Sequence, residues 1–307
     1  MAAVAAAALG LTFASACGSE RFAVDGARAW ARVKQQVDFG PRIPGTPGHE
    51  KMRAWLVAEL TKLGAEVEQQ SFADSTLGRP LVVTNVIARW PAAASGAKDR
   101  HVLLCAHWDS RPWSDQDPDR AHWNDPCPGA NDGGSGVAVL LEVAECLARK
   151  KAPVAVDLGF WDAEDLGKPE KPDEYSIGAR GYAARLPAPG DPRRPVAAFL
   201  FDMVGDKDLD IWMEGQSQES ASNLVEMVLE GAHATGGIHF HNAVGYTITD
   251  DHIPLLQAGL PAVDLIDFNY PAWHTRADLP DQVSAASLAE VSRVAAWLVY
   301  RSPLARP

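Results

Sequence analysis

Short apolar runs alternate with amphipathic stretches along most of the chain. The runs at 102–107 and 154–161 are largely apolar, which is typical of strands that are buried on both faces. Further strands are predicted at 65–72, 81–90, 197–203 and 262–266. Apolar residues that recur every three or four positions predict helices at 26–37, 49–63, 136–149, 221–231 and 285–301.

This order of elements favours an α/β fold, a three-layer α/β/α sandwich around a mixed, mostly parallel twisted sheet. The 307 residues are enough for one large core, and no internal repeat or long linker divides them. We therefore expect a single catalytic domain over residues 25–305. In such sheets the ligand site lies beyond the carboxyl ends of the strands.

Residues 1–17 differ from the rest of the chain. The first 16 are almost wholly Ala, Val, Leu and Phe, a run too short to span a membrane and typical of a signal peptide. The small residues before Cys17 resemble a lipoprotein cleavage site, although no Lys or Arg precedes the run and Ala14 stands where Leu is usual. We expect an exported protein, periplasmic or extracellular, either anchored by lipid at Cys17 or cleaved with Cys17 incidental.

Composition excludes several classes of function. The net charge of −12 repels phosphate backbones, so a nucleic-acid partner is not expected. The chain has no GxSxG, HExxH, P-loop or GxGxxG motif, which disfavours a serine hydrolase. Three further cysteines, at 105, 127 and 146, allow at most one disulfide among them. We expect a monomer.

Acidic or imidazole side chains follow the predicted core strands. His107 ends the first of them, and Asp109, two positions on, is placed to orient its ring. The glycine-rich segment 129–136 then brings Asp132 to the start of a helix, where it serves either as an N-cap or as a metal ligand.

Stronger signals follow the next strands. Asp162, Glu164 and Asp165 repel one another unless a cation or a shared proton is present. Asp202 stands at the end of an apolar strand, where a carboxylate is costly unless it is paired or bound to metal. The later polar motifs are Asp250-Asp251-His252 and Trp273-His274-Thr275. A mixed set of imidazoles and carboxylates suits Zn²⁺ with one position open for substrate.

In this order the motifs resemble the M28-type zinc aminopeptidase fold. Several segments resemble, more specifically, the bacterial members of the animal-type glutaminyl cyclases. These segments are AHWDSRP at 106–112, GANDGGSG at 129–136, FWDAED at 160–165, DDHIP at 250–254 and YPAWHT at 270–275. The resemblance covers roughly residues 25–300.

The resemblance implies one catalytic Zn²⁺, bound by Asp132, Asp165 and His274, with Glu164 as the general acid and base. It implies that an N-terminal glutamine of a peptide is cyclised to pyroglutamate with release of ammonia. The chain departs from the animal pattern at two positions. Asp165 replaces a glutamate, which leaves open whether Glu164 or Asp165 is the ligand, and Asp264 stands where animal members carry a histidine.

Four further roles are implied in the same way. Asp202 and Asp251 would form a hydrogen-bonded acid pair near the metal. Trp273 and Asp250 would bind the substrate, which is the N-terminus of a peptide.

The main alternative is a two-zinc aminopeptidase, which would use the same residues. His107 and Asp202 would then bind a second zinc ion, Asp132 would bridge the two ions, and Glu164 would activate a metal-bound water. A non-catalytic relative on the same fold would lack some of these groups, whereas here none of the required residue types is missing.

Overall fold

A six-stranded sheet forms the centre of the molecule in the computed structural model, which describes residues 22–93 and 100–305. The first two strands run antiparallel to their neighbours, and the other four run parallel to one another. The predicted mixed, mostly parallel sheet is therefore confirmed. In spatial order the strands are β1 (Glu66–Asp74), β2 (Leu81–Trp90), β4 (Ala155–Trp161), β3 (His101–His107), β5 (Pro195–Asp202) and β8 (Ala262–Ile266).

Strand β3 shows how the sheet is buried on both faces. Successive side chains of a strand point to opposite faces. Accordingly, Val102 and Leu104 pack into the larger apolar core, whereas Leu103 and Cys105 pack into a second core on the other face. A strand with both faces covered needs apolar residues at every position, which explains the uninterrupted run in the sequence.

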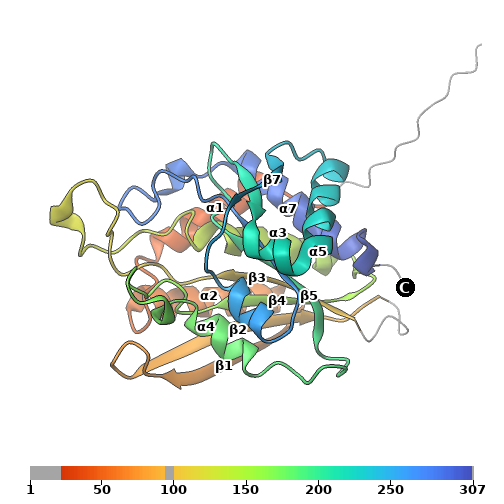
Figure 1. The fold of residues 1–307 in the computed structure, drawn as a ribbon, viewed down its shortest axis with the longest axis horizontal. Helices are drawn as coiled ribbons and strands as arrows, with labels where there is room; N and C mark the ends of the chain where they lie inside the picture. Colours follow the sequence, from red (N-terminus) through yellow and green to blue (C-terminus); the bar gives the residue numbers. More distant parts are fainter. Residues whose placement is uncertain (1–21, 94–99, 306–307) are drawn as a thin grey trace, which may run out of the picture.

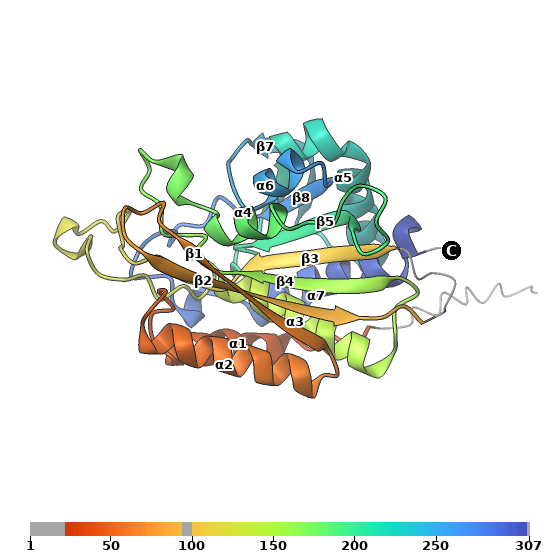
Figure 2. The ribbon, with the colours of Figure 1, turned by 90° about the horizontal axis from the view of Figure 1, so that it is seen from below.

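Helices cover the two faces unequally, as Figures 1 and 2 show. On one face lie α1 (Gly26–Asp38), α2 (Pro47–Lys62), α3 (Gly134–Arg149) and α7 (Ala285–Tyr300), and α5 (Gly215–Thr235) packs against α7 and β8. On the other face lie the shorter helices α4 (Ile177–Ala183) and α6 (His252–Gln257). The predicted three-layer sandwich is thereby confirmed.

Several short elements were not predicted from the sequence. Helices α4 and α6 have seven and six residues, too few for a clear periodic pattern. A separate parallel pair of strands, β6 (Ile211–Glu214) and β7 (Phe240–Tyr246), is largely exposed along β7 and lacks an apolar run. Short 3₁₀ turns occupy Arg120–His122, Pro172–Glu174, Pro280–Gln282 and Pro303–Ala305.

Helix α5 begins earlier than the prediction of 221–231. Its first turn is polar, so it carries no apolar periodicity, and Glu214 caps it by accepting hydrogen bonds from the backbone N–H groups of Gln216 and Ser217. The backbone at Ala221 departs from helical geometry, with φ −145°, and marks a kink at the point where the apolar pattern starts.

The signal-like segment 1–17 and Cys17 lie outside the described residues. Within the described part of the chain, no helix combines the length and the apolar character that crossing a bilayer requires. The cysteines at 105, 127 and 146 are buried and unpaired, so none of the disulfides that the sequence allows is formed.

Candidate active site

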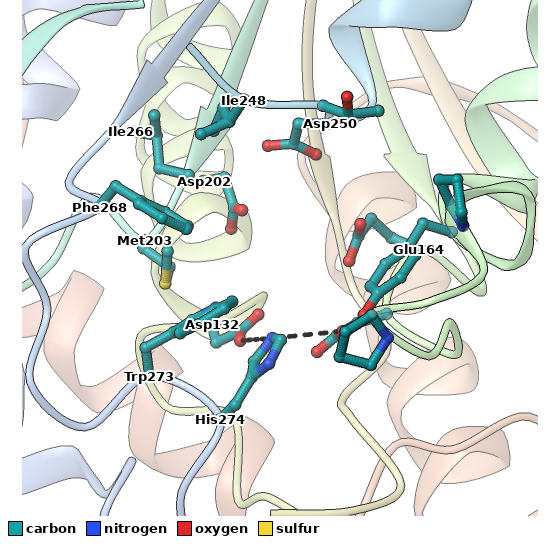
Figure 3. A pocket seen from close by; sticks show the side chains of 15 residues that line it. Asp132, Glu164, Asp202, Met203, Ile248, Asp250, Ile266, Phe268, Trp273 and His274 are labelled. Atoms are coloured by element: carbon teal, nitrogen blue, oxygen red, sulfur yellow. Dashed lines mark ion pairs between the residues drawn. The ribbon is translucent and has the colours of Figure 1, made fainter. Parts of the chain in front are cut away.

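The carboxyl ends of β3, β4, β5 and β8 meet at one edge of the sheet, and the segments that follow them surround a cavity of about 340 Å³. Carboxylates of Glu164, Asp202 and Asp250 point into it (Figure 3). The site thus lies beyond the carboxyl ends of the strands, as predicted from the sequence. Parallel strands bring residues that are distant in the chain to this one edge of the sheet.

Three predicted metal ligands gather on one side of this cavity. The His274 Nε2 atom lies 3.7 Å from Asp132 Oδ2 and 3.4 Å from Asp165 Oδ1. Ligand atoms around a tetrahedral zinc ion lie about 3.3 Å apart, since each is roughly 2.0–2.1 Å from the metal. Asp165 Oδ2 is buried and has no hydrogen-bond partner among the described residues. Such an atom is costly without a cation, so the residues fit a zinc ion. We call Asp132, Asp165 and His274 the metal cluster.

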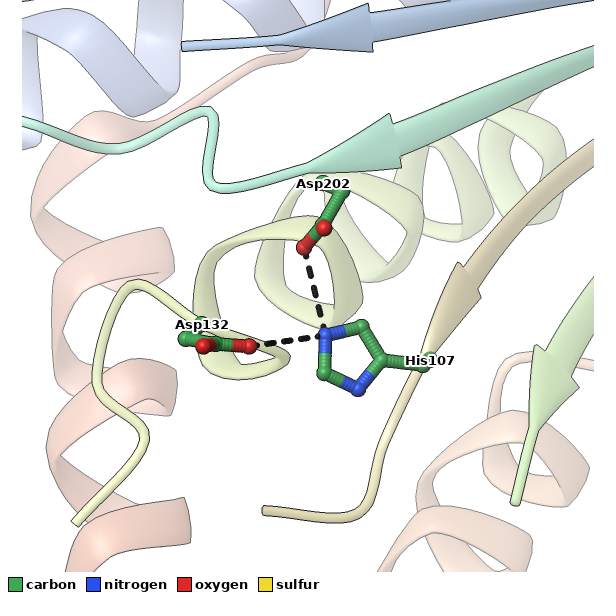
Figure 4. A group of neighbouring side chains, drawn as sticks. All are labelled: His107, Asp132 and Asp202. Atoms are coloured by element: carbon green, nitrogen blue, oxygen red, sulfur yellow. Dashed lines mark hydrogen bonds and ion pairs between the residues drawn. The ribbon is translucent and has the colours of Figure 1, made fainter. Parts of the chain in front are cut away.

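A second group shares Asp132 with the metal cluster. The His107 Nε2 atom lies 3.1 Å from Asp132 Oδ1 and 3.2 Å from Asp202 Oδ1 (Figure 4). The two oxygens of Asp132 therefore face two different histidines. We call His107, Asp132 and Asp202 the His107 cluster. It contains the residues that the two-zinc alternative requires.

The two histidines differ in protonation. Burial, together with the positive charge of Arg111, lowers the pKa of His274 to about 3, so this imidazole is neutral and its lone pair is available to a metal. Burial also acts to lower the pKa of His107, but Asp202, Asp109 and Asp132 outweigh it and raise that pKa well above its usual value. In the metal-free protein, this raised pKa favours the imidazolium form of His107.

Asp109 holds the segment that carries Glu164. Its oxygens accept hydrogen bonds from the backbone N–H groups of Glu164, at 3.0 Å, and Asp165, at 3.2 Å. Its contact with His107 Nδ1, at 3.4 Å, is longer, so the predicted orientation of the His107 ring is its weaker contribution. Burial and the charge of Asp165 raise the pKa of Glu164 well above its usual value. Glu164 is thus suited to proton transfer.

Backbone strain is concentrated at the site. Ala163, Met203 and His274 have φ values of 58°, 47° and 54°, although none of them is glycine. Each conformation of this kind costs about 1–3 kcal/mol and persists only where the surrounding structure imposes it. At Ala163 the turn separates two acids that an extended strand would point to the same side.

Asp162 is the one acid of the 162–165 motif whose side chain points away from the site. Its Oδ1 lies 2.8 Å from His49 Nε2, and its Oδ2 accepts a hydrogen bond from the backbone N–H of Thr84 at 2.7 Å. Both oxygens are therefore satisfied away from the cavity. Of the three acids in this motif, only Glu164 and Asp165 line it.

The predicted hydrogen-bonded pair of Asp202 and Asp251 is not formed. Among the described residues, neither oxygen of Asp251 has a hydrogen-bond partner, and Asp202 is paired with His107 instead. Burial and the neighbouring Asp250 raise the pKa of Asp251 well above its usual value, which favours its protonated form. Asp250 itself lines the cavity, as expected for a group that meets substrate.

Behind these acids, His252 lies between two carboxylates. Its Nε2 is 3.1 Å from Glu214 Oε2, and its Nδ1 is 3.5 Å from Asp264 Oδ2. Asp264, which departs from the animal pattern, is thus buried beside an imidazole rather than at the wall of the cavity.

Asp278, to which the sequence analysis assigned no role, holds the loop before α3 in place. One of its oxygens accepts hydrogen bonds from the Asn131 N–H at 2.8 Å and the Tyr270 hydroxyl at 2.6 Å, and the other accepts from the Asp132 N–H at 3.2 Å. Burial raises the pKa of Asp278 to about 7, and the charge of Asp132 adds to the effect. No local pattern in the sequence marks a residue that acts on a loop 146 positions away.

Arg42 is a second unforeseen residue. Its buried guanidinium donates hydrogen bonds to the backbone carbonyls of Trp108, Pro128 and Gly129. It therefore ties the end of β3 to the glycine-rich segment that carries Asp132. In the sequence, Arg42 lies between Pro41 and Pro44, in the break between the two predicted helices 26–37 and 49–63, and nothing there indicates this role.

Aromatic and aliphatic side chains form the rest of the cavity wall. Trp273 stacks on His274 with ring centroids 3.8 Å apart, and Phe268 packs against Trp273 at 5.1 Å. Ile248 and Tyr175 line the same cavity. Trp273, predicted to contact substrate, thus lies at the wall and also stacks on the ring of a predicted metal ligand.

Known proteins resemble this chain in sequence and in fold. The family model "Peptidase family M28" matches residues 85–299. A curated glutaminyl-peptide cyclotransferase-like protein from Mus musculus is 29% identical over 280 residues, which cover 83% of this chain and 70% of that protein. The crystal structure of Tannerella forsythia glutaminyl cyclase is 34% identical, with a TM-score of 0.84, over 91% of this chain and 99% of that one. A Zn-dependent exopeptidase from Parabacteroides distasonis is also 34% identical, with a TM-score of 0.84, over 91% and 98%.

Proposed function

Since the chain belongs to peptidase family M28, we propose that it is a zinc-dependent glutaminyl cyclase, which converts the N-terminal glutamine of a peptide to pyroglutamate and releases ammonia. One observation carries the proposal. Asp132, Asp165 and His274 converge on a single point at the wall of a cavity into which Glu164 also points. The cyclase names of the Mus musculus relative and the Tannerella forsythia structure support the choice of reaction.

The metal cluster supplies two carboxylates and one neutral imidazole. When bound there, zinc would polarise the γ-carbonyl of the glutamine side chain as a Lewis acid. Three protein ligands leave a fourth position for the substrate oxygen, which is the usual arrangement of a catalytic zinc site. Trp273 keeps the His274 ring in place by stacking on it.

Glu164 would move the proton. It accepts a proton from the α-amine as the amine nitrogen bonds to the carboxamide carbon, Cδ, and it returns that proton to the side-chain nitrogen, whose bond to Cδ breaks so that it leaves as ammonia. Its raised pKa brings the carboxyl closer to neutral pH, where a group that both accepts and donates a proton works best. The nucleophile and the electrophile belong to one substrate, so the protein mainly has to orient them.

The remaining lining would hold the peptide N-terminus. Asp202 and Asp250 provide acidic groups for the α-amine, and Phe268, Ile248 and Trp273 provide apolar surface for the glutamine methylenes. Because the cavity of about 340 Å³ is small, we propose that only the first residues of a peptide enter it.

The alternative, a two-metal aminopeptidase, is favoured by one specific observation. Asp132 presents one oxygen to His107 and the other to His274, as a carboxylate that bridges two metals would. In that case the His107 cluster would hold the second ion, and Glu164 would activate a water molecule for hydrolysis of the first peptide bond.

Parallel assays of the purified protein separate the two reactions. A Gln-initiated peptide would be followed by ammonia release, and a leucine anilide by the release of aniline. We expect turnover of the first and none of the second. Hydrolysis of the anilide without cyclisation of the peptide would overturn the proposal.

We further propose that the protein is exported and monomeric, with residues 1–17 as its signal segment and a lipid anchor at Cys17. Membrane fractionation of cells fed a labelled fatty acid tests the anchor, with Cys17→Ser as the control. Label that persists in Cys17→Ser would overturn the assignment of the anchor. Light scattering of the protein without its first 17 residues tests the monomer, and a dimer mass would contradict it.

A further inference from the structure

Arg111 lies just after β3 and is 1% exposed. Its guanidinium meets two carboxylates at once. Nε and Nη2 donate to the two oxygens of Asp115 at 2.7 and 2.8 Å, and Nη1 donates to Asp165 Oδ1 at 2.6 Å. Charge-assisted and bidentate bonds of this kind are among the strongest in proteins, so all three groups are held firmly.

These carboxylates place Arg111 behind two members of the metal cluster. Asp165 is a member itself. Asp115 Oδ1 lies 3.6 Å from His274 Nδ1, while the opposite ring nitrogen of His274 faces Asp132 and Asp165. At 3.6 Å this contact is too long for a hydrogen bond. The charge of Asp115 nevertheless favours the tautomer of His274 that carries its proton on Nδ1 and leaves Nε2 for a metal.

We propose that Arg111 is a positioning residue for zinc, which orients Asp165 directly and His274 through Asp115. The inference rests on the zinc site of the proposed function, but not on the reaction that the site performs. Arg111 binds Asp165 Oδ1, the same oxygen that lies 3.4 Å from His274 Nε2, and Oδ2 stays buried without a hydrogen-bond partner among the described residues. The bond from Arg111 thereby limits the rotation of a side chain that is one methylene shorter than glutamate.

The shape of the guanidinium matters as well as its charge. Its third contact is with the Tyr175 hydroxyl at 3.3 Å, and its carbon lies 5.6 Å from the centre of the Trp113 ring and 5.7 Å from that of Tyr175. A lysine ammonium is a point charge without the planar fork, so it cannot hold both carboxylates in the same geometry.

Arg32 provides a matched control. Its side chain is 8% exposed and pairs with Glu142 and Glu145, each at 2.8 Å, between α1 and α3 and away from the cavity. Replacing Arg32 by methionine therefore also breaks a buried pair with two acids, but it touches no member of the metal cluster.

The test measures zinc affinity by competition with a chromogenic chelator, using the full chain stripped of metal. We expect Arg111→Met to weaken zinc binding about 10–100-fold, the usual effect of removing a group behind a metal ligand. Arg111→Lys should recover only part of this loss, and Asp115→Asn should weaken binding less than Arg111→Met. Arg32→Met should lower thermal stability and leave zinc affinity unchanged.

Wild-type zinc affinity in a folded Arg111→Met would overturn the inference, and so would a loss in Arg32→Met as large as in Arg111→Met. If Arg111→Met does not fold, Arg111→Lys decides, because affinity equal to the wild type would show that position-specific hydrogen bonds are not needed. A wild-type protein that binds zinc but cyclises no peptide would refute the proposed function and leave the inference on Arg111 standing.

Discussion

The metal cluster and the His107 cluster contain the same kinds of residues, share Asp132, and yet differ in charge. In the metal cluster the imidazole is neutral, because burial and the neighbouring Arg111 oppose its protonation. Burial acts to lower the pKa of His107, but Asp202 and Asp132 of its cluster and the neighbouring Asp109 outweigh it and raise that pKa. The metal cluster therefore has two carboxyl groups and no positively charged side chain of its own. The His107 cluster, in contrast, already contains a positively charged imidazolium.

This difference in charge explains how the same fold can hold either one metal ion or two. A buried carboxylate must be met by a proton, a cation or hydrogen bonds. In the metal-free protein, a protonated His107 would satisfy Asp202 and one oxygen of Asp132, whereas Asp165 Oδ2 has no partner among the described residues. We therefore expect a single zinc ion at the metal cluster, and displacement of the His107 proton by a second ion would turn the site toward aminopeptidase chemistry.

Replacing each histidine in turn gives the largest expected effect. His274→Gln should leave almost no zinc after dialysis against metal-free buffer, because it removes a ligand, and activity should be lost with the metal. His107→Gln should retain about one zinc per chain, weakened by at most the 10–100-fold typical of a group behind a ligand. Metal analysis of both dialysed proteins checks this. A wild type with two zinc ions, of which His107→Gln loses one, would refute the difference between the clusters.

Glu164→Gln should remove turnover without removing metal. Loss of a general acid and base lowers kcat by about 10²–10⁴-fold, because the amide cannot take up the amine proton. Zinc content and thermal stability should stay near the wild-type values. Asp109 binds this segment through the backbone N–H of Glu164, which the substitution leaves in place. If zinc content falls in parallel with kcat, Glu164 rather than Asp165 is the ligand.

Glu214 should make stability depend on pH at a distance from both clusters. Burial acts to raise its pKa, but hydrogen bonds from His252, Gln216 and Ser217 outweigh it and lower the pKa from the ordinary 4.5 to about 2. A depressed carboxyl pKa contributes stability above pH 4.5, which is lost as the pH falls toward 2. Glu214→Gln should cost about 1–2 kcal/mol at neutral pH, because a shift of this size corresponds to about 3 kcal/mol, and solvent screening together with the remaining amide oxygen reduces it.

Urea unfolding of the wild type and of Glu214→Gln between pH 2.5 and 7 measures this difference. The two curves should converge toward the acid end. A constant gap across the range would mean that the contribution of Glu214 does not depend on its charge.

A loss of the helix cap at Ser284 should lower stability slightly without changing the site. Ser284 caps α7 by accepting hydrogen bonds from the backbone N–H groups of Ala286 and Ser287. Ser284→Ala should lower the free energy of unfolding by about 1 kcal/mol and leave both clusters intact. Calorimetry and zinc titration of this variant give the check, and a change in zinc affinity would show that the metal cluster responds to general loosening.

The sequence predicted the central strands because their signal is local. Strands buried on both faces must be apolar at nearly every position, as β3 and β4 are. The acids at the strand ends were visible for the same reason. Short or exposed elements such as α6 and β7 carry no such signal, because tertiary contacts rather than periodicity stabilise them.

Within the site, the sequence predicted which residues take part but not where each side chain points. It showed three acids at 162–165 without showing that the left-handed turn at Ala163 sends Asp162 to His49 and Glu164 into the cavity. The supporting roles of Asp278 and Arg42 depend on contacts across distant parts of the chain. Such contacts exist only after folding, so no spacing rule within one sequence reveals them.

Anomalous diffraction at the zinc edge, from crystals of the metal-loaded protein, locates every bound zinc ion. We expect one peak, roughly 2.0–2.1 Å from His274 Nε2 and between Asp132 and Asp165. A second peak of equal height between His107 and Asp202, or no peak beside His274, would contradict it.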